Sequence, residues 1–141
     1  MSASAGWEHF ETEADVGVRA WAATRADAFA QAALGVFALI VRPEEVEERE
    51  RREVRAQADS RERLLVGWIN ECLYVHEIEG FVVRRVEVDA CSDAVVHGVL
   101  HGEELDVRRH RPGTIVKAAT LHQVIVSESG GRHEVEVIVD V

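Results

Sequence analysis

The half of the chain that begins at Phe81 contains four strand-like runs joined in pairs by turn sequences, and this pattern restricts the fold more than any other feature. The runs are rich in Val, Ile, Leu and Phe and cover residues 81–88, 94–100, 115–126 and 135–139. Residues 91–93 (Cys-Ser-Asp) separate the first pair and residues 129–131 (Ser-Gly-Gly) the second, and both sequences are typical of hairpin turns. A hairpin joins strands that run in opposite directions, so the pattern predicts a mainly antiparallel sheet.

Two segments in the first half have the apolar spacing of helices with one buried face. We expect the first helix to begin after Thr24, which caps it together with Asp27, and to stop before Pro43. We expect the second to begin after Ser60 and to end at Gly80. The two apolar stripes are Phe29, Ala32, Ala33, Val36, Phe37 and Ile40, and Leu64, Leu65, Trp68, Ile69, Cys72 and Leu73.

Shorter alternating runs complete the pattern at residues 7–10, 16–20 and 54–58, which we expect to be strands. The mixed charge run at 44–52 is expected to be a solvated connection, and residues 102–113 an irregular one. The sequence therefore predicts an α+β fold, with a mainly antiparallel sheet and two principal helices, in a single compact domain at residues 7–141. Residues 1–6 are expected to be a disordered tail.

The chain carries a formal net charge of −10, because 26 Asp and Glu residues outnumber 16 Lys and Arg residues. A protein that holds RNA or DNA by itself needs a basic surface to displace counterions, so we expect no direct nucleic-acid binding. An acidic protein can instead dock on a basic partner. No apolar run approaches the ~20 residues of a membrane span, and the first residues lack the features of a signal peptide. We therefore expect a cytoplasmic protein with no membrane contact.

Common motifs of catalysis and nucleotide binding do not occur in the sequence. There is no Gly-rich phosphate loop and no nucleophile elbow. His97 and His101 lie four positions apart on one predicted strand, so roughly 13 Å separates them and they are not expected to share one metal ion. Cys72 and Cys91 lie in apolar-periodic segments, and we expect both to be buried free thiols.

Carboxylates at the C-terminus are the strongest candidates for chemistry. An apolar strand runs almost to the last residue, so Asp140 presents a side-chain carboxylate and Val141 the terminal carboxylate. Hard divalent cations such as Ca²⁺, Mg²⁺ or Mn²⁺ bind clustered oxygens of this kind. A second side chain has to converge from elsewhere in the chain, and Asp15, at a break between two predicted strands, is a candidate.

A series of segments, taken in order, resembles the archease family. Residues 13–18 (Glu-Ala-Asp-Val-Gly-Val) resemble the archease signature of His-x-Ala-Asp followed by an apolar-Gly-apolar strand. Thr12 stands where the family has its His, with Glu13 between it and the Ala-Asp pair. The series continues with residues 28–33, 68–74, 102–106, His110, 116–122 and 138–141, so that the resemblance covers about residues 7–141.

This resemblance implies that the chain assists an RtcB-type RNA ligase, which joins RNA ends that bear a 3′-phosphate or cyclic phosphate. Archeases are described as promoting guanylylation of the ligase and its multiple turnover, in tRNA splicing or RNA repair. Carried over residue by residue, the metal ligands of the family fall on Asp15, Asp140 and Val141, and its functional lysine falls on Lys117. Lys117 and His110 are accordingly expected to contact the partner or a phosphate.

Lys117 is also notable in the composition, because it is the single lysine among 16 basic residues. A compact ammonium fits a tight site that a planar guanidinium does not. We expect a non-catalytic activator, with two alternatives from other classes. The first is a chaperone-like binding module for RNA-modifying enzymes, and the second is a small metal-dependent hydrolase, which would need a general base that the sequence does not supply beside the carboxylates. The identity of the metal, the oligomeric state and the RNA substrates stay open.

Overall fold

The computed structural model describes residues 4–141 and contains seven strands and two α-helices among them. The strands are β1 (Gly6–Glu11), β2 (Val16–Ala22), β3 (Glu50–Gln57), β4 (Phe81–Cys91), β5 (Val95–Glu104), β6 (Ala118–Ser129) and β7 (Arg132–Asp140). The helices are α1 (Arg25–Ile40) and α2 (Arg61–Glu79), with a short 3-10 helix, η1, at Pro43–Glu45. The predicted α+β class with two principal helices is confirmed.

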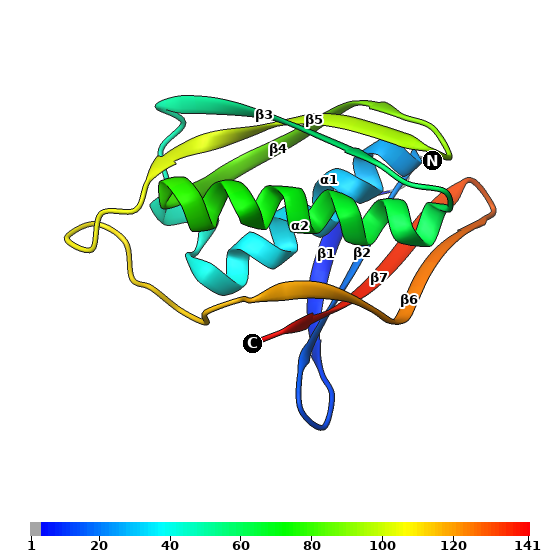
Figure 1. Ribbon diagram of the computed structural model, residues 1–141, viewed down its shortest axis with the longest axis horizontal. Helices are drawn as coiled ribbons and strands as arrows, with labels where there is room; N and C mark the ends of the chain where they lie inside the picture. Colours follow the sequence, from blue (N-terminus) through cyan, green and yellow to red (C-terminus); the bar gives the residue numbers. More distant parts are fainter. Residues whose placement is uncertain (1–3) are drawn as a thin grey trace.

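Three layers build the molecule, with the two helices lying between two antiparallel sheets (Figure 1). One sheet has the strand order β1-β2-β7-β6 and the other β3-β5-β4. Helix α1 packs on β1, β2 and β7 of the first sheet and on β4 of the second, and α2 packs on β6 and β3. The apolar faces of both helices and both sheets therefore meet in one core. Neither helix in the described part of the chain combines the length and the apolarity that a bilayer span requires.

Side chains at the helix ends explain where each helix begins and stops. The Thr24 hydroxyl accepts a hydrogen bond from the Asp27 amide at 3.1 Å, and the Ser60 hydroxyl accepts one from the Arg63 amide at 3.1 Å. Both are side-chain N-caps that satisfy an amide left without a partner in the first turn. Gly80 ends α2 in a left-handed conformation, with φ of 66°, which glycine adopts without steric cost. The predicted helix boundaries are confirmed.

Trp68 joins the two helices at the centre of the core. Its ring is fully buried, and its indole N–H donates to the Phe29 carbonyl at 3.0 Å. Burying an indole without such an acceptor is costly, so this bond lets the largest side chain of the core pack between the helices. Cys72, one turn further along α2, is a buried free thiol as expected, and burial raises its pKa. Cys91 is also free, but it is the last residue of β4 before a turn and is partly exposed, so the expectation that it is buried is wrong.

The charged run at 44–52 was expected to be a solvated connection throughout, but its last residues belong to β3, which begins at Glu50. Only one face of β3 packs against α2, so alternate side chains face solvent and a charged sequence can still pair its backbone with β5. Arg52 pairs with Glu50 and Glu79, both at 2.8 Å, and so ties the strand to the end of α2. Of the predicted tail at 1–6, residues 1–3 lie outside the described residues, and Gly6 is the first residue of β1.

Candidate functional site

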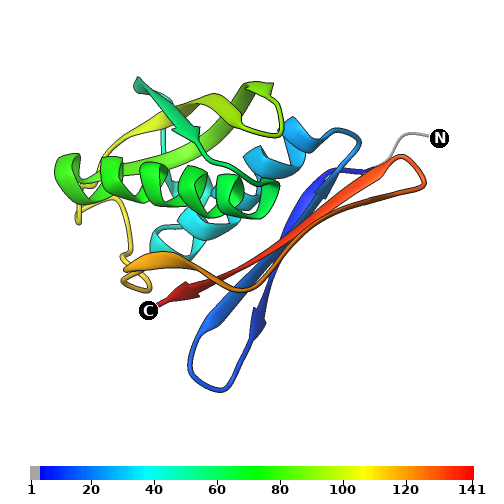
Figure 2. The ribbon, with the colours of Figure 1, turned by 45° about the vertical axis from the view of Figure 1, so that its right-hand side comes forward.

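Two carboxylates that are distant in the sequence come to the same end of neighbouring strands. β2 and β7 pair antiparallel, and Val16 opposite Val139 is the last pair of their register. Asp15 directly precedes Val16 and Asp140 directly follows Val139, so both residues lie at this end of the sheet. A turn holds Asp15 in position, because the Thr12 hydroxyl accepts from the Asp15 amide and donates to the Asp15 carbonyl, each at 3.0 Å. Figure 2 shows the β1–β2 hairpin and the C-terminal end of β7 on the same side of the molecule.

Lys117 reaches this end of the sheet through its main chain. Its amide donates to the Asp140 carbonyl at 2.8 Å, and the next residue, Ala118, lies opposite Asp140 in the register of β6 and β7. The Lys117 side chain is exposed and has no ion-pair partner among residues 4–141. One end of the four-stranded sheet therefore carries Asp15, Asp140, Lys117 and Val141. We call these four residues the carboxylate edge.

Asn70 of α2 fixes the strand that carries Lys117. Its side-chain amide donates to the Ala119 carbonyl at 3.3 Å and accepts from the Ala119 amide at 2.7 Å. β6 is an edge strand, and this pair of bonds satisfies backbone groups that a neighbouring strand would otherwise occupy. The helix layer therefore sets the position of β6 next to the carboxylate edge.

A small hollow beside Asp15 contains two residues that the sequence did not indicate as site residues. The hollow has a volume of about 320 Å³, and His122 and Gln123 of β6 line it together with Thr12 and Asp15. The register of β6 shifts between Thr120 and Ile125, and Gln123 has a φ of 52°. Such bulges redirect side chains and occur often beside functional sites. No Gly or Asn marks the bulge, so the sequence carried no turn signal for it.

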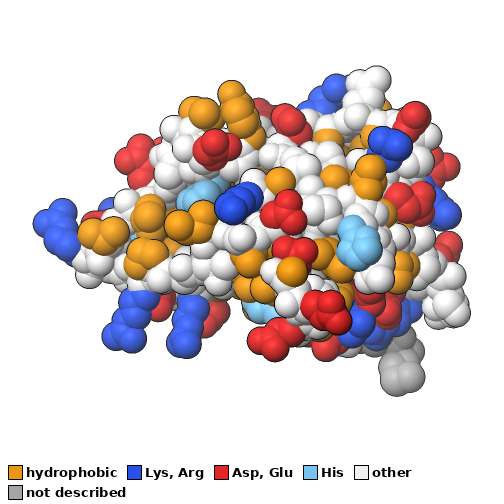
Figure 3. Space-filling view, turned by 60° about the horizontal axis from the view of Figure 1, so that its bottom comes forward, with side chains coloured by type: hydrophobic (Ala, Val, Ile, Leu, Met, Phe, Trp, Pro, Cys, Tyr) orange, Lys and Arg blue, Asp and Glu red, His pale blue; other side chains and the backbone are white. Residues whose placement is uncertain are grey.

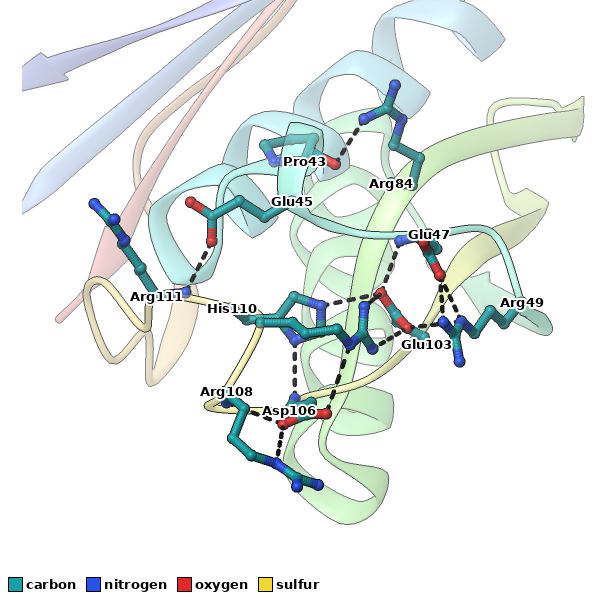
Figure 4. A network of polar contacts seen from close by, with 11 residues as sticks. Pro43, Glu45, Glu47, Arg49, Arg84, Glu103, Asp106, Arg108, His110 and Arg111 are labelled. Atoms are coloured by element: carbon teal, nitrogen blue, oxygen red, sulfur yellow. Dashed lines mark hydrogen bonds and ion pairs between the residues drawn. The ribbon is translucent and has the colours of Figure 1, made fainter.

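Glu103, at the end of β5, is the centre of a buried polar network (Figure 4). Its side chain is only 3% exposed. Its carboxylate accepts two hydrogen bonds from Arg109, at 2.6 and 3.2 Å, and one from the Glu47 amide at 2.8 Å. The Arg109 guanidinium is the main reason why the pKa of Glu103 is lowered to about 2, against the effect of desolvation.

His110 completes this network and is buried, whereas a residue that contacts a partner has to lie at the surface. Its ring is 1% exposed. Its Nδ1 accepts from the Asp106 amide at 2.8 Å, so Nε2 carries the proton and donates to Glu103 at 3.0 Å. Both ring nitrogens are used, and in this conformation neither is available to a phosphate or a partner. The expected direct contact is therefore replaced by a structural role, which is to anchor the connection at residues 105–117.

The two histidines of the second sheet each contact a surface carboxylate. His97 lies 2.6 Å from Asp89, and His101 lies 2.5 Å from Glu87. Within residues 4–141, no group of three or more His, Cys, Asp or Glu side chains has a metal-binding arrangement. Any ion at the carboxylate edge therefore needs ligands beyond the side chains of Asp15 and Asp140.

Known proteins match this chain over almost its whole length. The model of the Archease protein family (MTH1598/TM1083) matches residues 7–141. The archease of Pyrococcus abyssi is 34% identical over 139 residues, which covers 96% of this chain and 98% of that protein. The archease of Thermococcus gammatolerans is 37% identical over 125 residues, covering 86% and 88% of the two chains.

Solved structures show the same fold. The solution structure of protein 1598 from Methanobacterium thermoautotrophicum has a TM-score of 0.79 at 30% identity, and the match covers 96% of this chain and 99% of that one. A crystal structure from Thermotoga maritima, described as an archease and possible chaperone, has a TM-score of 0.57 at 18% identity and covers 94% of both chains. With the family model and the relatives in agreement, the chain belongs to the archease family.

Proposed function

We propose that this protein is a non-catalytic activator of an RtcB-type RNA ligase, promoting guanylylation of the ligase and its multiple turnover. The proposal places the assisting chemistry at the carboxylate edge. The observation that supports it is the register of β2 and β7, which ends at Val16 and Val139, the residues next to Asp15 and Asp140 in the sequence. Membership of the archease family supports the choice of partner.

The oxygen atoms at the carboxylate edge are of the type that divalent metal ions such as Ca²⁺ and Mg²⁺ prefer as ligands. Asp15 and Asp140 offer side-chain carboxylates, and Val141, directly after β7, adds main-chain oxygen atoms. Ca²⁺ takes six to eight oxygen ligands and Mg²⁺ six, so three residues leave coordination positions for water or for a partner. A bound divalent ion supplies charge neutralisation for phosphate oxygens during nucleotidyl transfer. An incompletely coordinated edge is suited to a metal that is shared with a second protein.

The charge of Lys117 and the net charge of the chain both bear on how the carboxylate edge binds its partner. The exposed ammonium lies one residue before β6 and has no carboxylate partner in the described chain, so it is available to a phosphate or a carboxylate of the ligase. The net charge of −10 favours docking on a basic cleft and opposes a direct hold on RNA. His110 contributes indirectly, by holding the connection that leads into Lys117.

A chaperone-like binding module is the second candidate, and one observation favours it. Several large apolar side chains are exposed near the connection at 105–117, among them Ile115 at 80% and Val107 at 73%. Apolar surface of this kind suits binding of other proteins without a metal. The two candidates differ in whether Asp140 is required.

A multiple-turnover ligation assay distinguishes these functions. With the ligase limiting, we expect product to exceed one equivalent only when this protein is present, and Asp140→Asn to lose that effect. Asp59→Asn is the matched control, since Asp59 is 86% exposed and lies outside the carboxylate edge. Full assistance by Asp140→Asn would refute the metal-carboxylate mechanism and favour the chaperone-like module. Turnover of GTP or RNA by the purified chain alone, lost in Asp140→Asn, would identify it as an enzyme.

A further inference from the structure

An apolar groove lies between α2 and the connection at 105–117, separate from the hollow beside Asp15. Its volume is about 400 Å³. The residues that make its walls apolar include Ile40, Leu73, Leu105, Ile115 and Val116. A cavity of this size takes one or two large side chains or a small ligand. Figure 3 shows hydrophobic side chains gathered at the end of the molecule that carries this connection.

Main-chain bonds hold the wall formed by the connection in place. The Gly113 amide donates to the Ile40 carbonyl and the Thr114 amide to the Leu39 carbonyl, each at 2.7 Å, so this segment closes the end of α1. A Cβ at position 113 would lie 2.5 Å from the Leu39 carbonyl oxygen, which explains why glycine occupies it. The buried His110 fixes the other side of the segment. The groove is therefore preformed, and binding in it needs little ordering of the chain.

Polar groups at the groove are few and come from both walls. Lys117 lines it at the end of the connection, and Glu77 and His76 line it on α2. His76 uses Nδ1 to donate to the Phe81 carbonyl at 2.9 Å, which leaves its Nε2 as an acceptor in the neutral ring. Neither Lys117 nor Glu77 has an ion-pair partner in the part of the chain that the structure describes. An occupant that is apolar and carries a carboxylate toward Lys117 matches these walls.

Lys117 connects the groove to the carboxylate edge. It is one of the residues that line the groove, and its amide donates to the Asp140 carbonyl at 2.8 Å. An occupant of the groove that contacts Lys117 therefore lies close to the end of β7. RNA is a poor occupant, because a single cation among apolar walls offers little to a chain of phosphates.

We propose that the apolar groove docks a segment of the ligase in which a large apolar side chain lies next to a carboxylate. The apolar side chain fills the groove, and the carboxylate pairs with Lys117. This inference rests on the proposed function for the identity of the partner. It adds a binding site that lies outside the carboxylate edge and sets the orientation in which that edge meets the ligase. Buried apolar anchors of this type commonly supply most of the energy of a protein interface.

Binding of the ligase from the same genome to Ile115→Lys and to Val107→Lys tests the groove. Ile115 lines the groove and is 80% exposed, whereas Val107 lies on the same connection outside it and is 73% exposed, so both variants should fold as the parent chain does. We expect the first to bind about tenfold or more weakly by calorimetry and the second to bind within about twofold. Equal binding by both variants and the parent chain overturns the groove and leaves the proposed function standing. No binding of the ligase by the parent chain overturns both.

A photo-crosslinker identifies what occupies the groove. Benzophenone-alanine at position 115 is irradiated with the ligase and RNA present, and the adduct is mapped by mass spectrometry. We expect a ligase peptide that has a large apolar residue beside Asp, Glu or a chain end. A crosslink to RNA, to a second copy of this chain, or to a ligase segment without a carboxylate refutes the proposed occupant.

Discussion

Glu103 and Asp140 are both carboxylates at the last or next-to-last position of a strand, yet their surroundings differ in every respect. Glu103 is 3% exposed and accepts hydrogen bonds from Arg109, His110 and the Glu47 amide. Asp140 is exposed and makes no side-chain ion pair within residues 4–141. The chain satisfies one carboxylate completely and leaves the other to solvent.

This difference separates charges that hold the fold from charges that are available to a partner. A buried carboxylate with all its acceptor positions used cannot gain a ligand without breaking internal bonds. A solvent-facing carboxylate beside a second one experiences repulsion that a cation relieves. His110 lies in the same internal network as Glu103, because both of its ring nitrogens are used inside the fold.

Removing the Glu103 carboxylate should have the largest effect on stability. Glu103→Ala leaves Arg109 and His110 without their shared acceptor, so we expect a loss of about 3–5 kcal/mol in the free energy of unfolding, measured by urea denaturation. The neighbouring Glu104 is exposed, and Glu104→Ala is the control, with a change within about 0.5 kcal/mol. A similar, small change in both variants would show that the network contributes nothing to the fold.

Acid should remove the contribution of Glu103 in a defined range of pH. The pKa of this carboxyl falls from 4.5 to about 2 in the folded chain, so its stabilisation is complete above about pH 4.5 and disappears as the pH falls toward 2. The shift corresponds to about 3 kcal/mol. In Glu103→Gln the side chain does not titrate, and the difference in unfolding free energy between the two proteins should shrink by that amount between pH 5 and pH 2. A constant difference would contradict the lowered pKa.

Local signals in the sequence were sufficient for the ends of the helices and for one hairpin turn, but not for the bounds of β3 and β6. Thr24 and Ser60 mark helix starts by their own side chains, and Gly80 marks a helix end by its permitted backbone, so each could be identified without its tertiary neighbours. The turn at residues 129–131 likewise contains the two glycines, both with positive φ, that its hairpin requires. Such features depend on residues a few positions apart, which is why they were predictable.

Features that depend on distant partners were not accessible in the same way. Glu103 is buried because Glu47 and Arg109 meet it from other segments, and nothing near it in the sequence announces this. The bulge at Gln123 uses a residue that rarely takes positive φ, so composition gives no warning. The hypothesis that Asp15 and Asp140 share a metal ion came from the resemblance and stays a prediction, while the register of β2 and β7 brings both residues to one end of the sheet.

Asn70 connects the helix layer to the open edge, and its removal should cost less than the loss of Glu103. Asn70→Ala leaves both the amide and the carbonyl of Ala119 without partners, so we expect a loss of about 1–3 kcal/mol in the free energy of unfolding. Glu71→Ala, an exposed neighbour on α2, should change it by less than about 0.5 kcal/mol. Faster amide hydrogen exchange along β6 in Asn70→Ala would locate the effect, and unchanged exchange there would contradict it.

Lys117→Arg should change the fold least while still impairing function. The side chain is exposed and makes no ion pair in the described chain, so unfolding should change by less than about 0.5 kcal/mol. The guanidinium is broader and its donors are fixed in direction, so a contact made by a compact ammonium is misplaced. Displacements of about 1 Å can cost on the order of 10²-fold in a catalysed step. Ligase guanylylation under multiple turnover measures the loss, with thermal melting as the control. If Lys117→Arg assists the ligase as well as the parent chain does, Lys117 has no role in assistance. If assistance and melting temperature fall together, the role of Lys117 is structural. Only a variant that melts like the parent chain and assists poorly shows that the charge of Lys117 serves the partner and not the fold.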